Sequence, residues 1–454
     1  MNELITTINE FLWGSFLIAL LLGTGIYFTF KLKFVQIRKF SQGIRRVTGG
    51  ANLNGKAADK DGMSSFQALA TAVAAQVGTG NLAGAATAIA SGGPGAIFWM
   101  WLSAFFGMAT IYAEAVLGQV FKTRKNDQVT GGPAYYIHRG LGSNKKSKAL
   151  AVFFALACIA SLGFMGNAVQ ANSISAAFNN AFGVSPLITG IAVALMSGFV
   201  FFGGLKRIAS FTEKVVPVMA GLYIVTCVFI LLWNFESFIP ALSSIFIEAF
   251  SPRAVVGGAL GVAVKKSIRY GVARGLFSNE AGMGSTPHAH AIAKVPHPND
   301  QGTVAIVTVF IDTFIVLTCT ALVILSSNID LTANTGIVLT QSAFEATLGI
   351  FGRTFIAICL FFFAFSTIVG WYFFGEANIR FLFKSSGSIA IYRVLVMALI
   401  VLGSLLNVEL AWELSDLFNG LMVLPNLIAL LALSGLVKEK MEESENLVPE
   451  PSSI

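Results

Sequence analysis

This 454-residue chain contains eleven stretches of mostly apolar residues. A helix needs about twenty residues to cross the hydrocarbon layer of a membrane, and these stretches approach or exceed that length. Charged residues make up only 12% of the chain, against about a quarter in soluble domains. We therefore predict an all-α polytopic membrane protein with about 11 transmembrane helices, surrounded by membrane lipid. The predicted helices are at residues 12–30, 64–91, 95–121, 149–177, 185–203, 214–233, 255–292 (interrupted), 302–326, 351–379, 388–407 and 412–436.

Positive charges collect in the loops beside these stretches. The segment 31–60 holds eight Lys or Arg residues and a single Asp, and loops at 122–148, 206–214 and 380–384 are also basic. Basic loops stay on the cytoplasmic side of a plasma membrane, so we predict a multi-pass protein with its N-terminus outside and its C-terminus in the cytoplasm. The net charge of +7 then has a topological cause, and nucleic acid is not an expected partner.

The two ends of the chain and one internal segment need separate interpretations. The first apolar stretch follows Glu3 and Glu10 and lacks a cleavage site of small residues, so we expect it to remain as a helix. Residues 437–454 are charged and contain Pro, which predicts a disordered cytoplasmic tail. Residues 254–274 carry basic side chains on the predicted outer half. We expect them to form partly a surface-lying helix that leads into a short half-helix.

Two glycine-rich polar segments recur within the apolar stretches. Residues 78–87 and 276–285 share the pattern Asn-x-Ala-Gly-x-x-Thr/Ser, and their asparagines, Asn81 and Asn279, are 198 positions apart. Unwound backbone inside a membrane is tolerated only where it lines a cavity, and a pair of such interruptions points to a binding site.

The places of these segments also predict an internal repeat. After an extra N-terminal helix at 12–30, ten helices remain, and the broken ones are the first and the sixth. This order predicts two five-helix repeats, at 64–233 and 255–436. Because each repeat has an odd number of spans, the second copy is inverted in the membrane.

The first break is predicted at Thr79, Gly80 and Asn81. Its glycine lets the backbone leave helical geometry, and the half-helix that follows presents free N–H groups and a positive dipole end. A carboxylate suits this place, with the Thr79 hydroxyl as a further donor. The alternative is a simple packing kink, because Gly-rich transmembrane helices are common.

The second break is predicted at Phe277, Ser278 and Asn279, which offer an aromatic wall, a hydroxyl and an amide. Gln170 adds an uncharged polar group near the middle of its span. Together these groups suit an ammonium and a small side chain. Trp371 is a candidate pocket wall, although ordinary packing is the commoner fate of a buried aromatic residue.

A small cation also has candidate ligands. The carbonyls freed ahead of the first break, including those of Ala74 and Val77, are oxygen dipoles, and Ser366 and Thr367 add two hydroxyls at mid-span. Such a neutral oxygen site suits sodium. The alternative is that both hydroxyls bond back onto their own helix.

Four carboxylates lie within predicted spans, at Glu114, Glu280, Asp312 and Glu376. Acids within a membrane are functional or paired. Glu280 directly follows the predicted second break and is expected to support its geometry or to bind an exposed amide. Glu114 and Glu376 are placed nearer the cytoplasmic ends, where pairing with Lys or Arg is expected.

Neither an enzyme nor a resident cofactor is predicted. The four Cys residues lie in apolar runs without paired spacing, so they indicate no disulfide framework or metal site. His288, His290 and His297 cluster after the second motif, but no Cys or acid has matching zinc-ligand spacing. A polytopic enzyme would need a denser cluster of such side chains at a membrane face.

The chain resembles a known family in three motifs: GTGNLAGAATAIASGGPGA at 78–96, GGPAYYI at 131–137 and ARGLFSNEAGMGSTPHAHA at 273–291. They are similar to the sodium:alanine (alanine or glycine:cation) symporter family of the amino acid-polyamine-organocation superfamily. This resemblance implies the leucine-transporter-type fold with a 5+5 inverted repeat. It also implies secondary active symport of alanine and glycine with sodium into the cell, by alternating access.

The same resemblance implies roles for individual residues. Thr79, Gly80, Gln170, Phe277 and Ser278 would surround the amino acid, with Ser366 and Thr367 on sodium. Asn81 and Asn279 would be additional substrate-binding or break-stabilising groups. Two alternatives remain, a proton-coupled amino acid transporter of the same fold, separated by whether uptake follows a pH gradient, and a cation channel, separated by a sodium current without amino acid.

Overall fold

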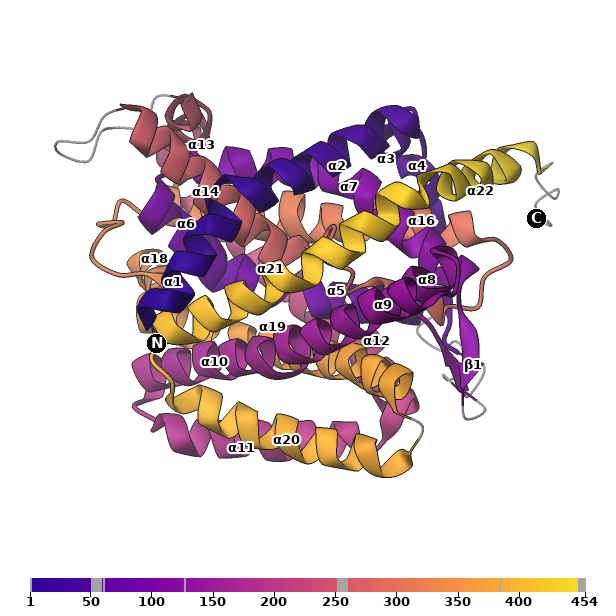
Figure 1. The fold of residues 1–454 in the computed structure, drawn as a ribbon. Coiled ribbons are helices and arrows are strands. Elements are labelled where there is room, and N and C mark those ends of the chain that lie inside the picture. The colour runs from indigo at the N-terminus through magenta and orange to yellow at the C-terminus, as the bar shows by residue number, and fades with distance from the viewer. Residues whose placement is uncertain are drawn as a thin grey trace.

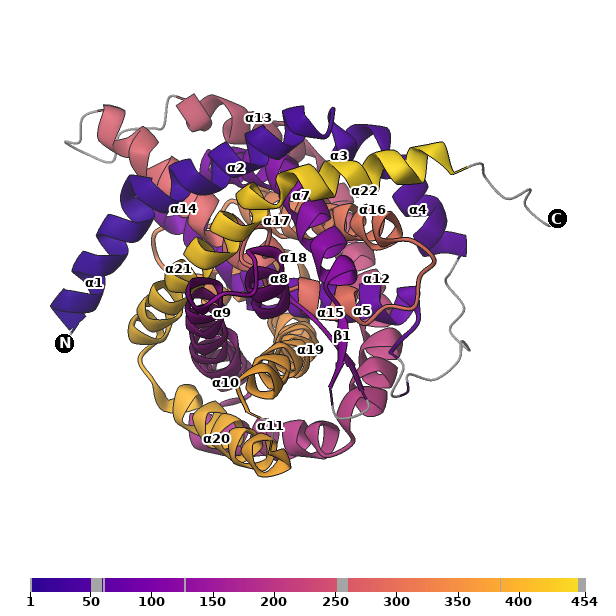
Figure 2. The same ribbon diagram turned by 45° about the vertical axis from the view of Figure 1, so that its right-hand side comes forward.

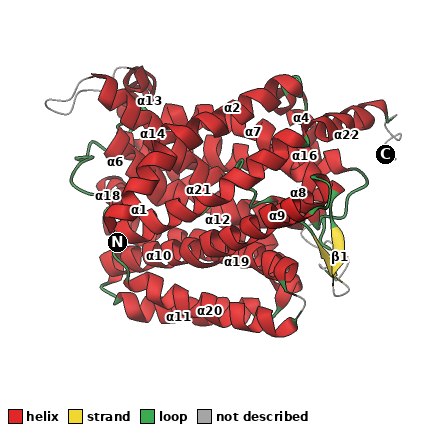
Figure 3. Ribbon diagram, viewed as in Figure 1, coloured by secondary structure: helices red, strands yellow, loops and turns green. Residues whose placement is uncertain are grey.

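The computed structural model describes residues 2–49, 59, 62–125, 128–250, 260–383 and 385–447. Helices form almost all of this part of the chain, and one short hairpin of two strands is present (Figure 3). Helices of the first half are α1 Asn2–Phe11, α2 Leu17–Lys31, α3 Val35–Arg38, α4 Phe40–Gly49, α5 Ser65–Gln76, α6 Ala85–Gly92, α7 Ala96–Val120, α8 Pro133–Gly140, α9 Lys145–Cys158, α10 Asn167–Phe182, α11 Pro186–Phe201 and α12 Gly204–Trp233.

The second half of the chain is also helical. Its helices are α13 Phe235–Phe250, α14 Leu260–Asn279, α15 Pro287–Ala291, α16 Pro298–Val309, α17 Thr318–Ser326, α18 Gly336–Leu348, α19 Ile350–Leu382, α20 Ser386–Leu405, α21 Val408–Ala432 and α22 Ser434–Asn446. The antiparallel hairpin pairs β1 Thr123–Lys125 with β2 Gln128–Thr130. Four π-helical segments interrupt the α-helices, at η1 Leu12–Phe16, η2 Gly80–Gly84, η3 Ile159–Gly166 and η4 Phe310–Leu317.

Each of the eleven predicted apolar stretches contains helix. Eight helical segments of the described chain are long and apolar enough to cross a membrane: Ile5–Lys31, Ala96–Val120, Lys145–Phe182, Gly204–Trp233, Pro298–Ser326, Ile350–Leu382, Gly387–Leu405 and Glu409–Ala432. Of the other three stretches, one forms the shorter apolar helix α11, and the other two contain the interrupted helices α5–η2–α6 and α14–α15. The prediction of a polytopic helical membrane protein is confirmed.

The long helices run between two ends of the molecule (Figure 1). The hairpin, α4, α8 and α22 gather at one end, whereas α6, α13 and α18 gather at the other. The basic segments around 31–49 and 122–139 therefore meet at the same end, as the loop charges indicate. Figure 2 shows α19 surrounded by other helices, with α11 and α20 at the periphery. Large exposed apolar side chains on α11, α12 and α20, such as Leu195, Val225 and Leu402, mark surfaces suited to lipid.

The structure corrects the prediction for residues 254–274. From Leu260 onward α14 is one continuous helix that includes Asn279, without a separate surface-lying segment, and residues 254–259 lie outside the described part. Gly271 makes the close packing possible, because a Cβ there would lie 2.4 Å from the Ala96 carbonyl oxygen on α7. The basic side chains separate accordingly, with Lys265 exposed and Arg274 buried.

The prediction of a disordered tail is wrong for residues up to Asn446. α22 buries Val437 and Met441 against the bundle. Glu445 forms ion pairs with Arg38 at 3.3 Å and Lys39 at 3.0 Å, which fasten this helix to α3 and the residue after it. Residues 448–454 lie outside the described part of the chain.

Small residues let helices cross closely, as expected where hydrophobicity alone does not hold helices together. On α20, a Cβ placed on Gly403 would lie 2.5 Å from Ala168 Cα on α10. The replacement Gly403→Ala should therefore lower the free energy of unfolding by about 1–3 kcal/mol through overpacking. Thermal unfolding of the purified protein in detergent measures this loss.

Gly23 on α2 supplies the matched control. It has no heavy atom within 4 Å of an added Cβ, so Gly23→Ala should leave the unfolding midpoint unchanged or slightly raised. Equal midpoints for the two variants would contradict the packing argument.

Candidate functional site

The first broken helix leaves helical geometry at Val77 and Gly78, and Thr79 is again in the helical region with φ −56° and ψ −30°. α5 ends at Gln76, Val77 has φ −79° and ψ 87°, and helix resumes at Gly80 as a π-helical turn. The prediction placed the break at Thr79, Gly80 and Asn81, so it is displaced by about one half-turn of chain. Asn81 is already helical, and its side-chain Oδ1 accepts from the Gly78 N–H at 3.0 Å.

Two glycines at this break allow close approach by other helices. A Cβ on Gly78 would lie 2.3 Å from the Thr367 hydroxyl oxygen of α19. A Cβ on Gly80 would lie 2.9 Å from Ser278 Cα of α14. The two motifs, far apart in sequence, therefore touch at Gly80 and Ser278.

The second break begins later than predicted. α14 continues through Phe277, Ser278 and Asn279, and the backbone then turns left-handed at Glu280, with φ 58°. Gly282 and Gly284 have φ of 88° and 81°, a region that glycine enters without strain. These three residues set the break at 280–286, before α15 starts at Pro287.

A buried carboxylate holds the unwound backbone of the second break. Glu114 of α7 accepts from the backbone N–H groups of Gly282 at 3.1 Å and Gly284 at 2.9 Å. Asn426 of α21 donates to the same carboxylate at 2.6 Å and to the Gly282 carbonyl at 2.9 Å. The expectation that Glu114 pairs with Lys or Arg is wrong, because an unwound segment supplies N–H donors instead. Glu376 does form its expected pair, with Arg380 at 2.7 Å.

Asp312 joins the two broken helices, and sequence reasoning did not select it as a site residue. It lies in η4, fully buried, and accepts from Asn81 Nδ2 at 2.7 Å on one side. On the other side, the Ser278 hydroxyl donates to its two oxygens at 2.9 and 3.1 Å. Its place as an acid in an apolar span was the available signal, and the π-helical turn around it is typical of functional segments.

Polar side chains from other helices bind the ends of the two breaks. Gln170 of α10 accepts from both the backbone N–H of Thr79 at 3.1 Å and its hydroxyl at 2.6 Å. Gln76 Nε2 donates to the Asn279 carbonyl at 2.7 Å, and Asn279 Oδ1 in turn accepts from the Ala281 N–H at 3.1 Å. The sequence grouped Gln170 with the second break, whereas its hydrogen bonds in the structure are to Thr79 at the first.

An aromatic cluster borders the same place. The rings of Phe277 and Trp371 meet edge to face with centroids 5.6 Å apart, and Trp412 of α21 lies 4.6 Å from Phe277. The indole N–H of Trp371 donates to the Glu280 carboxylate, which also accepts from the Ser285 hydroxyl at 2.5 Å. Glu280 therefore orients Trp371, so the aromatic wall and the second break are mechanically linked.

The candidate cation ligands are only partly brought together. The Thr367 hydroxyl donates to the Ala74 carbonyl at 2.8 Å and to its own helix at the Phe363 carbonyl at 3.1 Å. Ser366 donates to the same Phe363 carbonyl at 2.9 Å. Thr367 therefore contacts the last turn of α5, which ends just before Val77. The Ser366 hydroxyl instead bonds back onto its own helix, α19.

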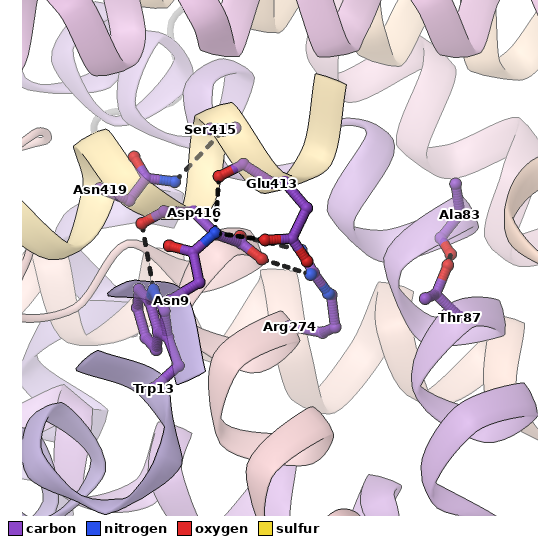
Figure 4. A network of polar contacts seen from close by, with 9 residues as sticks. All are labelled: Asn9, Trp13, Ala83, Thr87, Arg274, Glu413, Ser415, Asp416 and Asn419. Atoms are coloured by element: carbon purple, nitrogen blue, oxygen red, sulfur yellow. Dashed lines mark hydrogen bonds and ion pairs between the residues drawn. The ribbon is translucent and has the colours of Figure 1, made fainter. Parts of the chain in front are cut away.

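Figure 4 shows a polar network that joins α14, α21 and the N-terminal helix. Arg274, one turn before Phe277 on α14, forms a two-point ion pair with Asp416 at 2.6 and 3.1 Å, and its guanidinium lies 4.4 Å over the Trp412 ring. The N-terminal helix supports this network, since Trp13 Nε1 donates to the Asp416 carbonyl at 3.0 Å and Asn9 Nδ2 to Glu413 Oε2 at 2.5 Å.

The site itself is fully enclosed. Thr79, Asn81 and Ser278 have no exposed surface, and Gln170 is 1% exposed. The side chains around the two breaks are therefore cut off from water on both sides in this conformation.

The histidines near the second break have structural partners. His288 lies between the Ser285 carbonyl at 2.6 Å and Asn378 at 2.9 Å, and His290 contacts Gln301 at 2.9 Å. Within the described residues, no group of three His, Cys, Asp or Glu side chains is placed to hold a metal ion.

Comparisons with known proteins agree with one another. The family model described as "Sodium:alanine symporter family" matches residues 1–449. The sodium/alanine symporter AgcS of Methanococcus maripaludis is 43% identical over 441 residues, with 96% of this chain and 95% of that protein covered. The probable sodium/glutamine symporter GlnT of Bacillus subtilis is 43% identical over 438 residues, covering 96% and 89%.

The fold is shared with a solved structure at low sequence identity. The crystal structure of MhsT in complex with L-phenylalanine matches with a TM-score of 0.59 and 15% identity, and the match covers 86% of this chain and 99% of that one. The predicted leucine-transporter-type fold is confirmed.

The Glu114 contacts generate a prediction. Glu114→Ala should leave two backbone N–H groups and the Asn426 amide without their buried acceptor, at a cost of about 1–3 kcal/mol for each unsatisfied group. We expect a lower midpoint of thermal unfolding in detergent together with loss of activity. Glu236→Ala, which removes an exposed carboxylate from α13, is the matched control and should change neither. Unchanged stability of Glu114→Ala would contradict the proposed support of the break.

Proposed function

This chain belongs to the sodium:alanine symporter family and is a sodium-coupled amino acid symporter, and we propose that the amino acids it carries are alanine and glycine. The observation that carries this proposal is the contact between Gly80 and Ser278, which brings both broken helices to one enclosed place. The finer assignments below are part of the same proposal.

The substrate carboxylate binds at the start of the half-helix that begins at Gly80. The N-cap residue Thr79 makes no side-chain bond to this first turn, so the N–H groups from Gly80 onward and the dipole end are suited to an anion. Thr79 adds a hydroxyl once it exchanges its contact with Gln170 for one with the substrate. Asn81 keeps the turn in shape through its bond to Gly78.

The substrate ammonium faces the second broken helix. Ser278 offers its hydroxyl, Asn279 terminates the helix, and the Asp312 carboxylate behind Ser278 supplies negative charge within bonding reach of both motifs. Gln170 completes the polar side of the pocket as an acceptor. An amino acid in its zwitterionic form thus meets a positive helix end and a buried acid.

Sodium binds beside the first break, between α5 and α19. The proposed ligands are the carbonyls of Ala74 and Val77 with the hydroxyls of Thr367 and Ser366, all neutral oxygens of the kind that sodium accepts. The 2.8 Å contact of Thr367 with the Ala74 carbonyl supports this location. Ser366 must rotate away from the Phe363 carbonyl to join the site.

Thr367→Ala tests the sodium site. Loss of one ligand should raise the sodium concentration needed for half-maximal alanine uptake by about tenfold, equivalent to roughly 1.4 kcal/mol, while alanine affinity at saturating sodium changes less. Thr226→Ala is the control, because this residue is half-buried and its hydroxyl bonds only to its own helix at Leu222. An unchanged sodium dependence would exclude Thr367 as a ligand.

The aromatic wall limits the size of the substrate. Phe277 and Trp371 enclose the place where a side chain would lie, and Trp371 cannot withdraw easily, because Gly166 and Glu280 fix its ring. Alanine and glycine fit such a wall better than a long amide side chain does. A relative that is 43% identical is named for glutamine, so this level of identity does not fix the size of the substrate.

Phe277→Ala should widen the pocket. We expect alanine uptake to fall by about tenfold or more, because one buried aromatic contact is worth roughly 1.5–3 kcal/mol. Glutamine should become a better competitor relative to the unmodified protein. Phe229→Ala, on the exposed surface of α12, is the control and should leave both properties unchanged. Weaker competition by glutamine in Phe277→Ala would contradict the steric argument.

Transport requires the enclosed site to open alternately to each side. Separation of Arg274 from Asp416 would open the side covered by α14 and α21, and sodium between α5 and α19 would favour the state that binds the amino acid. The proposed inverted repeats, 64–233 and 255–436, supply two structurally related sets of helices for these movements. In the proposed orientation the protein lies in the plasma membrane with its basic loops in the cytoplasm. The N-terminus is then outside, and the side of the site covered by Arg274 is extracellular.

The central test is uptake of labelled alanine into proteoliposomes with an inward sodium gradient. We expect accumulation that glycine competes and leucine does not, and no accumulation with potassium alone. Accumulation driven only by a pH gradient would assign the coupling to a proton and shift it to the buried acids. A sodium current without amino acid would instead indicate a channel.

A further inference from the structure

A groove of about 450 Å³ opens between α11 and α12 on the periphery of the bundle, away from the substrate site. Phe199 and Val200 form one wall, Arg207, Phe211 and Lys214 the other, and Phe365 of α19 lies at the base. The groove therefore reaches from the lipid-facing surface to the central helix α19.

The interior of this groove is apolar. Phe211 and Phe365 meet edge to face with centroids 5.3 Å apart, and Phe365 is almost completely buried. Phe199 at the rim is 69% exposed, which is expected for a side chain that faces hydrocarbon. An acyl chain suits such a surface, because a groove of this shape leaves aromatic and aliphatic atoms without packing partners.

The charges at the groove have one sign. Arg207 and Lys214 are seven residues apart on α12, so they lie on the same face two turns apart, and both are exposed. The only neighbouring acid in that stretch of α12, Glu213, is buried and accepts from Gln67 of α5 at 3.0 Å, so it is engaged on another face. The lining residues include no carboxylate.

The position of these cations fits the headgroup level of a bilayer. α12 has 30 residues, about ten more than a span requires, so its first turns extend beyond the hydrocarbon. Arg207 lies in these turns, with its guanidinium 4.3 Å over the Phe199 ring, and Lys214 can reach the same level by extending its side chain. A phosphate at this level would meet both cations while its acyl chains follow the apolar walls.

We propose that this groove binds an anionic phospholipid, with the phosphate held by Arg207 and Lys214 and an acyl chain packed on Phe365. If the basic end is cytoplasmic, the lipid comes from the leaflet that is rich in anionic headgroups. The site is also well placed to affect transport. Phe365 directly precedes Ser366 and Thr367, and α12 holds α5 through the Thr71–Thr212 contact at 3.1 Å.

Native mass spectrometry of the detergent-purified full chain with added phosphatidylglycerol tests the proposal. The double variant Arg207→Gln/Lys214→Gln should weaken retention of the lipid by about tenfold or more, since it removes both cations that attract the anionic headgroup. Lys145→Gln/Lys146→Gln, which removes two exposed cations from the start of α9, is the matched control and should retain the lipid.

A second variant tests the groove without a change of charge. Ser210→Trp should fill the space between α11 and α12 and displace the lipid, while thermal unfolding in detergent stays near that of the unmodified protein. Phosphatidylcholine and inorganic phosphate provide the comparison ligands, and neither should compete with phosphatidylglycerol. Equal retention by the double variant and its control, equal binding of phosphatidylcholine, or competition by inorganic phosphate alone would overturn the proposal.

Discussion

Backbone polar groups that leave helical geometry inside a membrane must find partners, because hydrocarbon offers none. The whole arrangement of this protein follows from that requirement. Two helices unwind, at 77–78 and 280–286. Side chains accept from the freed N–H groups: Asn81 and Asn279 within the broken helices themselves, and Gln170 and Glu114 from other helices. Glu114 holds the second break, Gln170 the first, and Gln76 links one to the other. Helices α7, α10 and α21 are thereby fixed around the breaks with little freedom of position.

The proposed binding site uses the same contacts. Asp312 and Gln170 are bonded to Ser278 and Thr79 in the enclosed state. In the proposed binding mode, each of these bonds is exchanged for one to a small zwitterion. Binding then replaces internal hydrogen bonds with bonds to the substrate, so a site buried from water need not leave polar atoms unpaired at any stage. Trp371, held by Glu280, connects the filling of this site to the shape of the second break.

Much of this arrangement could be predicted from sequence, and the failures have physical causes. Apolar length located the eight helices of the described chain that are long enough to cross a membrane, and the shared Asn-x-Ala-Gly pattern located both broken helices. The second break was displaced because α14 continues until the backbone turns left-handed at Glu280. The first break was displaced because the backbone already leaves helical geometry at Val77, where ψ is 87°. Glu114 and Asp312 were visible as acids within spans, but their partners are backbone N–H groups and short polar side chains from distant segments. Pairing of that kind depends on the tertiary fold and leaves no local pattern.

The partners of the second break have a consequence for biogenesis. Asn426, which bonds both Glu114 and the Gly282 carbonyl, lies in the last long helix of the chain, and Asn9 near the N-terminus bonds Glu413 in that same helix. During synthesis, the N-terminal helix and the unwound segment are therefore made long before their partner leaves the ribosome. Until α21 inserts, these polar groups depend on water, lipid headgroups or the insertion machinery. A chain truncated before α21 would leave these polar groups without their partners. Cellular quality control could recognise the unfinished protein by them.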